Sequence, residues 1–376
     1  MAGRHPLQRM SRLTKFLLVL LFAAVCLGGS AVLVLQLPTF GGEMAGERLE
    51  RMRRSPQYVD GRFVNSPPYK SALALWQNLR DYSGGQVRTP PFVMPVVPLP
   101  PASLLAPPVT GLRAIWFGHS TVLLEIDGVR VMTDPVLSPR ASPFQFIGPE
   151  RMHPPPIPLS QLEGIDVAVI SHDHYDHLDM GTVLQLARGG THFFVGLGIG
   201  AHLERWGVPL AQIHEMDWWE TVVYKGVEIH STPARHYSGR KRMDDSTLWS
   251  SWMIKSAGYS VYYSGDTGYG PHFAQIRERL GVPDMVLMKV GAYGDSWRDI
   301  HMDPELALKA QRDLGSQILL PVHWATFNLS YHAWAEPIER TLAAARNTDV
   351  QVVTPRVGEP FELGKPFDHP YWFRRP

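Results

Sequence analysis

The chain has 376 residues, and 36 lysine and arginine residues stand against 35 aspartate and glutamate residues. The resulting net charge of +1 gives no electrostatic basis for binding nucleic acid. The single cysteine, Cys26, excludes an internal disulfide framework and a metal site built from cysteines. Any bound metal must therefore be held by histidine and carboxylate side chains, and 16 histidines are present.

The N-terminal segment predicts a membrane anchor. Residues 1–15 are basic, and residues 16–37 contain no charged side chain. That apolar run is long enough for the roughly 20 residues that a helix needs to cross a bilayer. A cleaved signal peptide is the rival interpretation, but its apolar part would be shorter. The basic residues before the run predict a single-pass protein of the cell membrane, with its large domain outside the cytoplasm.

Residues 38–110 are interpreted as a stalk followed by a proline-rich strap. Residues 38 to about 60 are polar and charged, as in a stalk, and residues 71–82 favour one helix. Residues 89–108 are so rich in proline that a regular helix or a central strand is excluded there. The apolar residues between these prolines favour an extended strap that packs on the domain rather than a loose linker.

Residues 111–376 predict one domain that is rich in strands. The pair Asp127-Gly128 between two apolar runs indicates a hairpin. Strands and helices do not alternate strictly, which favours layers of sheet covered by helices. Helices are expected to start after Asp179, as N-cap, and after Asp303, the second ending near Gly315. Further strands are expected at residues 166–171, 227–234, 260–266 and 317–324.

The stretch SHDHYDHLD, residues 171–179, follows directly on the apolar strand at 166–171. Burying so many titratable groups without partners would be costly, and a cation would balance them. His172 and His174 are two positions apart and can grip one ion from an extended loop. Asp176 and His177 follow and can face a second ion. The stretch therefore predicts half of a two-metal site.

Three more candidate ligands follow other predicted strands: His236, Asp266 and His323. Rigid strands can aim such side chains at a common point. Two metals about 3.5 to 4 Å apart need a bridging carboxylate, and Asp266 suits that position. The remaining histidines that follow are interpreted as packed or surface residues: His153, His192, His202, His214, His230, His272, His332 and His369.

Here the sequence resembles a known family. HDHYDH fits the H-x-H-x-D-H signature of the metallo-β-lactamase superfamily. Longer blocks between residues 61 and 363 are similar, in the same order, to the family of phospholipases D that hydrolyse N-acylphosphatidylethanolamine. These blocks are WFGHSTVLLEIDGVRVMTDPVLSPRASPFQFIGPER, DWWE, MDDSTLWSSW, SGDTGY, GAYGDSW, HMDPELAL and HWATFNLS.

The resemblance implies an αββα sandwich with two Zn²⁺ ions bound between its sheets, although other divalent metals would suit the same ligands. Carried over residue by residue, it implies one zinc held by three histidines, a second held by Asp176 and two histidines, and Asp266 bridging both. The ligands of the first zinc are His172, His174 and His236, and those of the second are Asp176, His177 and His323.

The resemblance also implies roles around the metals. His301, in HMDPE, matches a family histidine beside the metals, and we expect it to contact the substrate phosphate or to protonate the leaving group. With Asp266 and Asp176 it forms the candidate catalytic set. Asp134, at a strand end, is expected to orient a metal-bound histidine, and His119 to approach the site. A turn residue before a proline, for Asp134, and a structural role, for His119, are the alternatives.

The implied activity is phosphodiester hydrolysis of phospholipase D type, which converts N-acylphosphatidylethanolamine-like lipids to phosphatidic acid and N-acylethanolamine with a water shared by two metals. A phospholipid and the membrane are the expected partners, nucleic acid is not, and a homodimer is left open. The alternatives are another hydrolase of this fold, acting on a lactone, an amide or a nucleotide phosphodiester, and a metal-binding membrane protein without turnover.

One residue of the signature departs from the family. Asp173 stands between the first two histidines, where the animal enzyme has asparagine. We expect its side chain to point away from the metals, with little effect. Residues 67–110 show no convincing match to the family, and they leave the lipid specificity open.

Overall fold

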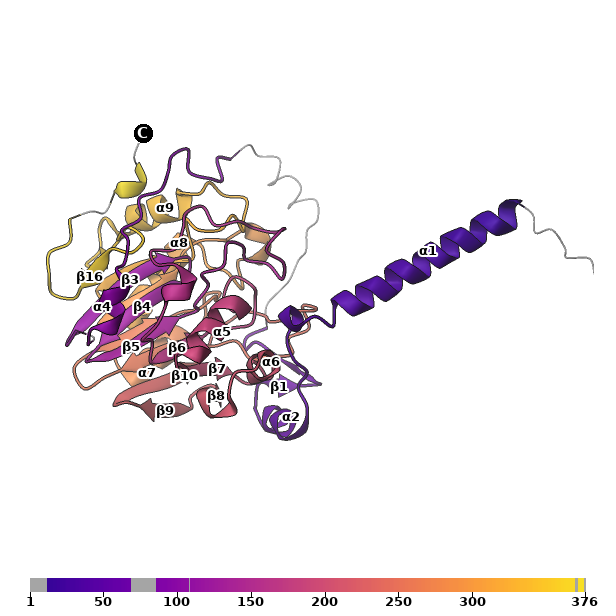
Figure 1. The fold of residues 1–376 in the computed structure, drawn as a ribbon. Coiled ribbons are helices and arrows are strands. Elements are labelled where there is room, and N and C mark those ends of the chain that lie inside the picture. Colours follow the sequence, from indigo (N-terminus) through magenta and orange to yellow (C-terminus); the bar gives the residue numbers. More distant parts are fainter. Residues whose placement is uncertain (1–11, 69–85, 108, 369–370, 375–376) are drawn as a thin grey trace, which may run out of the picture.

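The computed structural model describes residues 12–68, 86–107, 109–368 and 371–374. Two seven-stranded sheets lie face to face, and helices cover their outer faces (Figure 1). This is the αββα sandwich that the sequence predicts. The helix expected at 71–82 lies outside the described residues.

The first sheet has the strand order β16-β3-β4-β5-β6-β7-β8. Its first four strands pair antiparallel, and the strands from β5 to β8 pair parallel. The turn between β4 and β5 confirms the predicted hairpin, because Asp127 and Gly128 have φ of 45° and 86°. The strands are β3 (Leu112–Gly118), β4 (Thr121–Ile126), β5 (Val129–Thr133), β6 (Val167–Ile170), β7 (His192–Gly196), β8 (Ile213–Met216) and β16 (Pro360–Glu362).

The second sheet has the order β15-β14-β13-β12-β11-β10-β9. The strands from β12 to β15 are parallel, so their carboxyl ends lie at one edge of the sheet. That edge receives the residues which follow β12, β13 and β14. The strands are β9 (Thr221–Tyr224), β10 (Val227–Thr232), β11 (Ser251–Lys255), β12 (Ser260–Tyr263), β13 (Met285–Lys289), β14 (Ile318–Val322) and β15 (Gln351–Val352).

Helices α5 (Met180–Arg188) and α6 (Gly200–Trp206) cover the first sheet, and other helices cover the second. Both predicted N-caps are confirmed. The carboxylate of Asp179 accepts from the backbone N–H of Gly181, and that of Asp303 accepts from Leu306 at 2.9 Å. Gly315, at φ 83°, ends α8 as predicted. The outer helices of the second sheet are α7 (His272–Leu280), α8 (Pro304–Leu314) and α9 (Glu336–Ala345).

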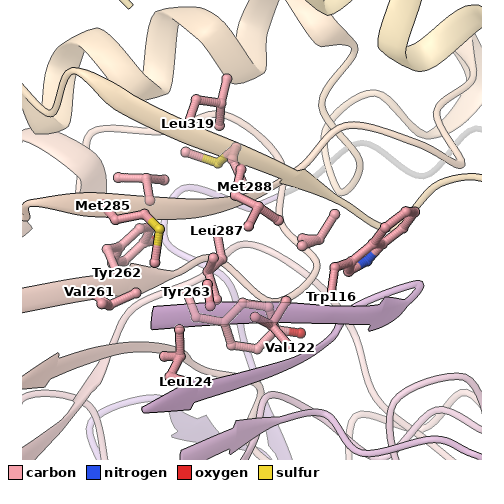
Figure 2. Packing of buried hydrophobic residues seen from close by; sticks show 14 of the residues in the cluster. Trp116, Val122, Leu124, Val261, Tyr262, Tyr263, Met285, Leu287, Met288 and Leu319 are labelled. Carbon is pink, nitrogen blue, oxygen red and sulfur yellow. The ribbon is translucent and has the colours of Figure 1, made fainter. Parts of the chain in front are cut away.

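The main core lies between the two sheets. Side chains alternate along each strand, so the first sheet turns one set of residues to the second sheet and the other set to α5 and α6. Figure 2 shows Trp116, Val122 and Leu124 from the first sheet opposite Tyr263 and Leu287 from the second. This packing fixes the two strand edges relative to each other, and with them the loops that carry the candidate ligands.

Helix α1 (Arg12–Val34) overlaps the segment 16–37 predicted as a membrane anchor, and it extends away from the sandwich (Figure 1). In the part of the chain that the structure describes, no helix combines the length and the apolar character needed to cross a bilayer. The span predicted at 16–37, and the single-pass, extracytoplasmic placement inferred from it, are therefore not supported. The helix stops at Val34, and the next residues bond to the domain instead of continuing it.

The segment expected to be a stalk packs on the domain. It contains η1 (Pro38–Phe40), α2 (Gly46–Arg53), β1 (Tyr58–Val59) and β2 (Arg62–Phe63). The side chains of Met52 and Phe63 are buried against Trp249 in a small separate core. A few apolar residues in a mostly polar segment thus suffice to attach it, and this attachment differs from the free stalk that the composition favours.

The proline-rich stretch lies on the domain as an extended strap, as predicted. Its backbone bonds to the C-terminal part of the chain, with the N–H of Val97 donating to the carbonyl of Val357 at 2.8 Å. Its own side chains Met94 and Leu104 are buried against the domain. One short helix, α4 (Pro101–Leu105), interrupts the extended backbone, because a proline is well tolerated in the first turn of a helix.

Candidate metal centre

The predicted ligands meet at one edge of the sandwich, although they come from four separate loops. His172 to His177 follow β6, His236 follows β10, Asp266 follows β12 and His323 follows β14. Their ligand atoms form overlapping groups in which every atom lies within 4.8 Å of the others. The two sheets therefore bring together residues that are far apart in sequence.

One group consists of three histidines, His172, His174 and His236. Nε2 of His172 lies 2.8 Å from Nδ1 of His174, and Nε2 of His236 lies 3.4 Å from the same atom. Three imidazole nitrogens thus converge on one point, an arrangement suited to a first-row divalent metal. The set is the one implied for the first metal.

The second group gathers around the carboxylate of Asp176. Its Oδ2 lies 3.3 Å from Nε2 of His177 and 3.4 Å from Nε2 of His323. Nε2 of His119 lies 3.0 Å from the same oxygen, so His119 joins this group. The sequence assigned His119 only an approach to the site, and the structure places it against a candidate ligand.

Asp266 lies between the two groups. Its Oδ2 is 3.0 Å from Nε2 of His323 and 3.3 Å from Nε2 of His177 on one side. On the other side it is 3.9 Å from Nε2 of His236, and Nε2 of His301 is 3.6 Å away. A carboxylate in this position can reach a metal in either group, which is the geometry of a bridge.

The residues fit a divalent cation because several buried atoms at this edge have no hydrogen-bond partner within the described chain. They include Nε2 of His177, Nε2 of His323 and Oδ1 of Asp266. Leaving such atoms unpaired costs about 1–3 kcal/mol each, and more for a charged group. Bound metal would satisfy all of them at once.

Both carboxylates are held in the form that binds a cation. Burial alone would raise the pKa of Asp266, but His323 and His177 hold it well below its usual value. For Asp176 the effect of burial is likewise outweighed, first by His177, and its pKa also lies well below the ordinary range. The centre thus presents two negatively charged carboxylates surrounded by imidazole rings.

Asp134 supports the second group from behind. Its Oδ2 accepts hydrogen bonds from Nδ1 of His177, from the hydroxyl of Tyr263 and from the hydroxyl of Ser171, each at 2.5 Å. Because Nδ1 of His177 donates to this carboxylate, Nε2 of the neutral ring is the nitrogen whose lone pair faces the site. This is the orienting position that the sequence suggested for Asp134.

Backbone strain is concentrated at the centre. His119, Asp134 and His323 have φ of 51°, 30° and 65°, in the left-handed region that residues other than glycine rarely occupy. Each such residue costs on the order of 1–3 kcal/mol and persists only where its surroundings hold it. Strain at three members of one cluster indicates that the fold sacrifices stability to place these side chains.

Sequence reasoning missed Ser171 and Tyr263, the other partners of Asp134, and also Lys289. Lys289 is fully buried at the end of β13, and its ammonium group donates to the carbonyl of Met302 at 3.2 Å. Burial lowers the pKa of Lys289 to about 7, although Asp266 and Asp303 act in the opposite direction. The only signal in the sequence is a lysine inside the otherwise apolar run MVLMKV.

Comparison with known proteins agrees with this geometry. The family described as the beta-lactamase superfamily domain matches residues 129–324. An uncharacterized protein of Mycobacterium tuberculosis is 43% identical over 332 residues, covering 85% of this chain and 88% of that protein. N-acyl-phosphatidylethanolamine-hydrolyzing phospholipase D 1 of Caenorhabditis elegans is 34% identical over 272 residues, covering 67% of this chain and 76% of that enzyme.

Among solved structures, Igni18, a metallo hydrolase from the archaeon Ignicoccus hospitalis, is 26% identical with a TM-score of 0.51. The match covers 67% of this chain and 98% of that structure. The chain therefore belongs to the N-acylphosphatidylethanolamine-hydrolysing phospholipase D-like family of the metallo-β-lactamase superfamily. It is a metal-dependent hydrolase of this fold.

Replacing Asp134 by asparagine should weaken metal binding by about 10- to 100-fold, because an amide cannot accept from all the donors that now face the carboxylate. Zinc affinity measured by competition with a chromophoric chelator checks this. Tyr263→Phe is the matched control, since it removes one donor to Asp134 and leaves the bond from His177 in place. Equal affinities for Asp134→Asn and the wild type would contradict the orienting role.

The buried Lys289 should make stability depend on pH between about 7 and 10. Below pH 7 both the folded and the unfolded chain hold the proton, so the cost of burying the charge is fully present. Above it the folded chain releases the proton while the unfolded chain keeps it, and the stability rises by up to about 1.4 kcal/mol per pH unit. Urea unfolding of the metal-free protein at several pH values measures this rise.

The variant Lys289→Met should be more stable than the wild type at pH 7, and this difference should shrink as the pH rises. The exposed Lys365 provides the control, because Lys365→Met should leave the pH profile of the wild type unchanged. A difference between Lys289→Met and wild type that stays constant from pH 7 to 10 would refute the lowered pKa of Lys289.

Proposed function

We propose that this protein hydrolyses the phosphodiester bond of N-acylphosphatidylethanolamine-like phospholipids, with two Zn²⁺ ions at the candidate metal centre. The observation that carries the proposal is the complete set of converging ligands, in which Asp266 reaches both groups. Two relatives that are 34% and 32% identical carry the name of N-acyl-phosphatidylethanolamine-hydrolyzing phospholipase D, which supports this substrate class.

In the proposed reaction the oxygen of water bonds to phosphorus, and the bond from phosphorus to the ethanolamine oxygen breaks. The products are phosphatidic acid and N-acylethanolamine, and the leaving oxygen takes up a proton. Divalent metals bound here would supply Lewis acidity and an activated water. The chain itself contributes the rigid placement of the ligands, with His177 fixed by Asp134.

His301 is the residue that we propose contacts the substrate phosphate. Its side chain is 13% exposed, so it borders the accessible side of the centre, and its Nε2 lies 3.6 Å from Oδ2 of Asp266. Burial, and next the charge of Lys289, hold the pKa of His301 well below its usual value. The ring is therefore neutral near pH 7 and offers an N–H hydrogen bond to a phosphoryl oxygen rather than a positive charge.

A lipid substrate also needs a way to reach the centre from a membrane or micelle surface. Apolar side chains are exposed where the loop after Asp134 meets the segment after α1, with Phe146 81% and Ile147 60% exposed. The ring of Phe144 in this loop lies 5.9 Å from that of Phe40. We call the following set the apolar rim: Leu35, Leu37, Phe144, Phe146 and Ile147.

Purified, zinc-loaded protein should convert N-acylphosphatidylethanolamine in detergent micelles to phosphatidic acid and N-acylethanolamine, as read by mass spectrometry. Asp266→Ala should abolish the products, because it removes the carboxylate that lies between the two groups of ligands. Treatment with a chelator should also abolish them, because it removes the metals. His301→Ala should lower kcat by about 100-fold or more if it stabilises charge on phosphorus. Zinc-bound wild-type protein that yields no product would exclude this lipid and favour another ester or phosphodiester substrate.

The apolar rim should act on lipid substrates alone. The double variant Phe146→Ser/Ile147→Ser should raise KM for micellar lipid several-fold, because exposed apolar side chains that insert into the surface are lost. Turnover of a water-soluble aryl phosphodiester should stay at the wild-type rate. The control Leu210→Ser removes an apolar side chain that is 64% exposed elsewhere. An equal loss of activity toward the micellar lipid and the soluble phosphodiester would show that the variant damages the metal centre instead.

A further inference from the structure

Asp173, the residue at which the signature departs from the family, makes specific contacts on the outer side of the metal loop (residues 171–179). Its carboxylate is fully buried. Oδ1 accepts from the backbone N–H of Gly239 at 2.8 Å, and Oδ2 lies 3.2 Å from Nε2 of His202. The side chain points away from the candidate metals, as expected from the sequence, but it does not point into solvent.

His202 links this carboxylate to the N-terminal part of the chain. The backbone N–H of Gly42 donates to Nδ1 of His202 at 2.9 Å. A backbone N–H can only donate, so Nδ1 is unprotonated and the proton of the neutral ring is on Nε2. That proton is donated to Asp173. Gly42, His202 and Asp173 thus form a chain of two hydrogen bonds with one possible direction.

Arg240 makes a second link between the same parts of the molecule. Its Nη1 donates to the carbonyls of Asp173 and Leu178, at 2.9 and 2.8 Å, and so ties together both ends of the metal loop. Its Nε donates to the carbonyl of Thr39 at 3.0 Å, and its guanidinium carbon lies 4.1 Å from the ring centroid of Tyr175. The donors of this buried arginine thus bond to backbone carbonyls of the metal loop and of the N-terminal segment, and so hold the two together.

The N-terminal strap, residues 36–42, is shaped to fit closely against these residues. A Cβ on Gly41 would lie 2.1 Å from Nδ1 of His202, and one on Gly42 would lie 2.1 Å from the carbonyl oxygen of Ala201. Only glycine permits this approach. The indole N–H of Trp206 donates to the carbonyl of Pro38 at 2.6 Å, which adds to the docking.

We propose that Asp173, His202 and Arg240 are positioning residues which, together with the N-terminal strap, hold the metal loop in its metal-binding shape. A carboxylate is required at position 173 because N–H donors face both of its oxygens. An asparagine would turn its NH₂ group toward one of these donors in either orientation. This inference rests on the proposed metal centre but is independent of the substrate.

Zinc affinity of the full-length protein, measured by chelator competition, tests the positioning role. Asp173→Asn and His202→Ala should lower the affinity of one metal by about 10- to 100-fold, in line with other supporting contacts of metal ligands. His202→Gln should restore it, because its amide can accept from Gly42 and donate to Asp173. His230→Ala, which removes a buried histidine on β10, should leave the affinity unchanged.

The role of the N-terminal strap is tested by a pair of glycine variants. Gly41→Ala would force a Cβ against His202 and should weaken zinc binding as His202→Ala does. Gly46→Ala is the matched control, because Gly46 also has a positive φ but a Cβ added there would meet no atom within 4 Å. Its zinc affinity should equal that of the wild type.

The outcomes separate this inference from the proposed function. Wild-type protein that binds no zinc would overturn the metal centre itself. Wild-type zinc affinity in Asp173→Asn, His202→Ala and Gly41→Ala would overturn the positioning role and leave the centre standing. Equal weakening in His202→Gln and His202→Ala would also contradict it, since the hydrogen-bond chain would then not be what matters.

Discussion

The structure depends on one electrostatic constraint, the gathering of seven imidazole rings and three carboxylates in a largely buried space where water solvates them poorly. Such groups are costly to bury unless they are paired, and several of their atoms have no protein partner within the described chain. A cation resolves the imbalance, which is why the same cluster is identified as a metal centre from its chemistry and from its geometry. The strain at His119, Asp134 and His323 is a second sign that placement takes precedence over stability at this edge.

The sandwich is the scaffold that makes this placement rigid. The parallel strands of each sheet end at a common edge, and the packed core between the sheets brings the two edges together. The other ligands follow such strands, and His236 follows the antiparallel strand β10. Around them lies a layer of fixed partners, with Asp134 behind His177 and the buried Lys289 beside the His301 loop. This layer sets the tautomers and charges on which binding and hydrolysis depend.

The N-terminal region is more closely integrated with the centre than its composition indicates. Its apolar residues Met52 and Phe63 pack against Trp249, and the strap that follows α1 bonds to Arg240 and His202. The apolar rim is formed jointly by the segment that follows α1, which includes this strap, and by the loop that begins at Asp134. One segment thus contributes both to the surface that we propose meets lipid and to the support of the metal loop that we propose.

The sequence alone determined the features whose cause is local. The hairpin at Asp127-Gly128, the N-caps Asp179 and Asp303, and the spacing of His172 to His177 each follow from neighbouring residues, and the longer motifs gave the family and the fold. The apolar run at 16–37 predicted a helix at the correct place, but not one that the structure supports as a membrane span. Only the tertiary structure decided that Asp134 meets His177, that Lys289 is buried beside the centre, and that Asp173 meets His202. These pairs join residues that are distant in sequence. The packing of the two sheets brings such partners together, and no local sequence pattern predicts them.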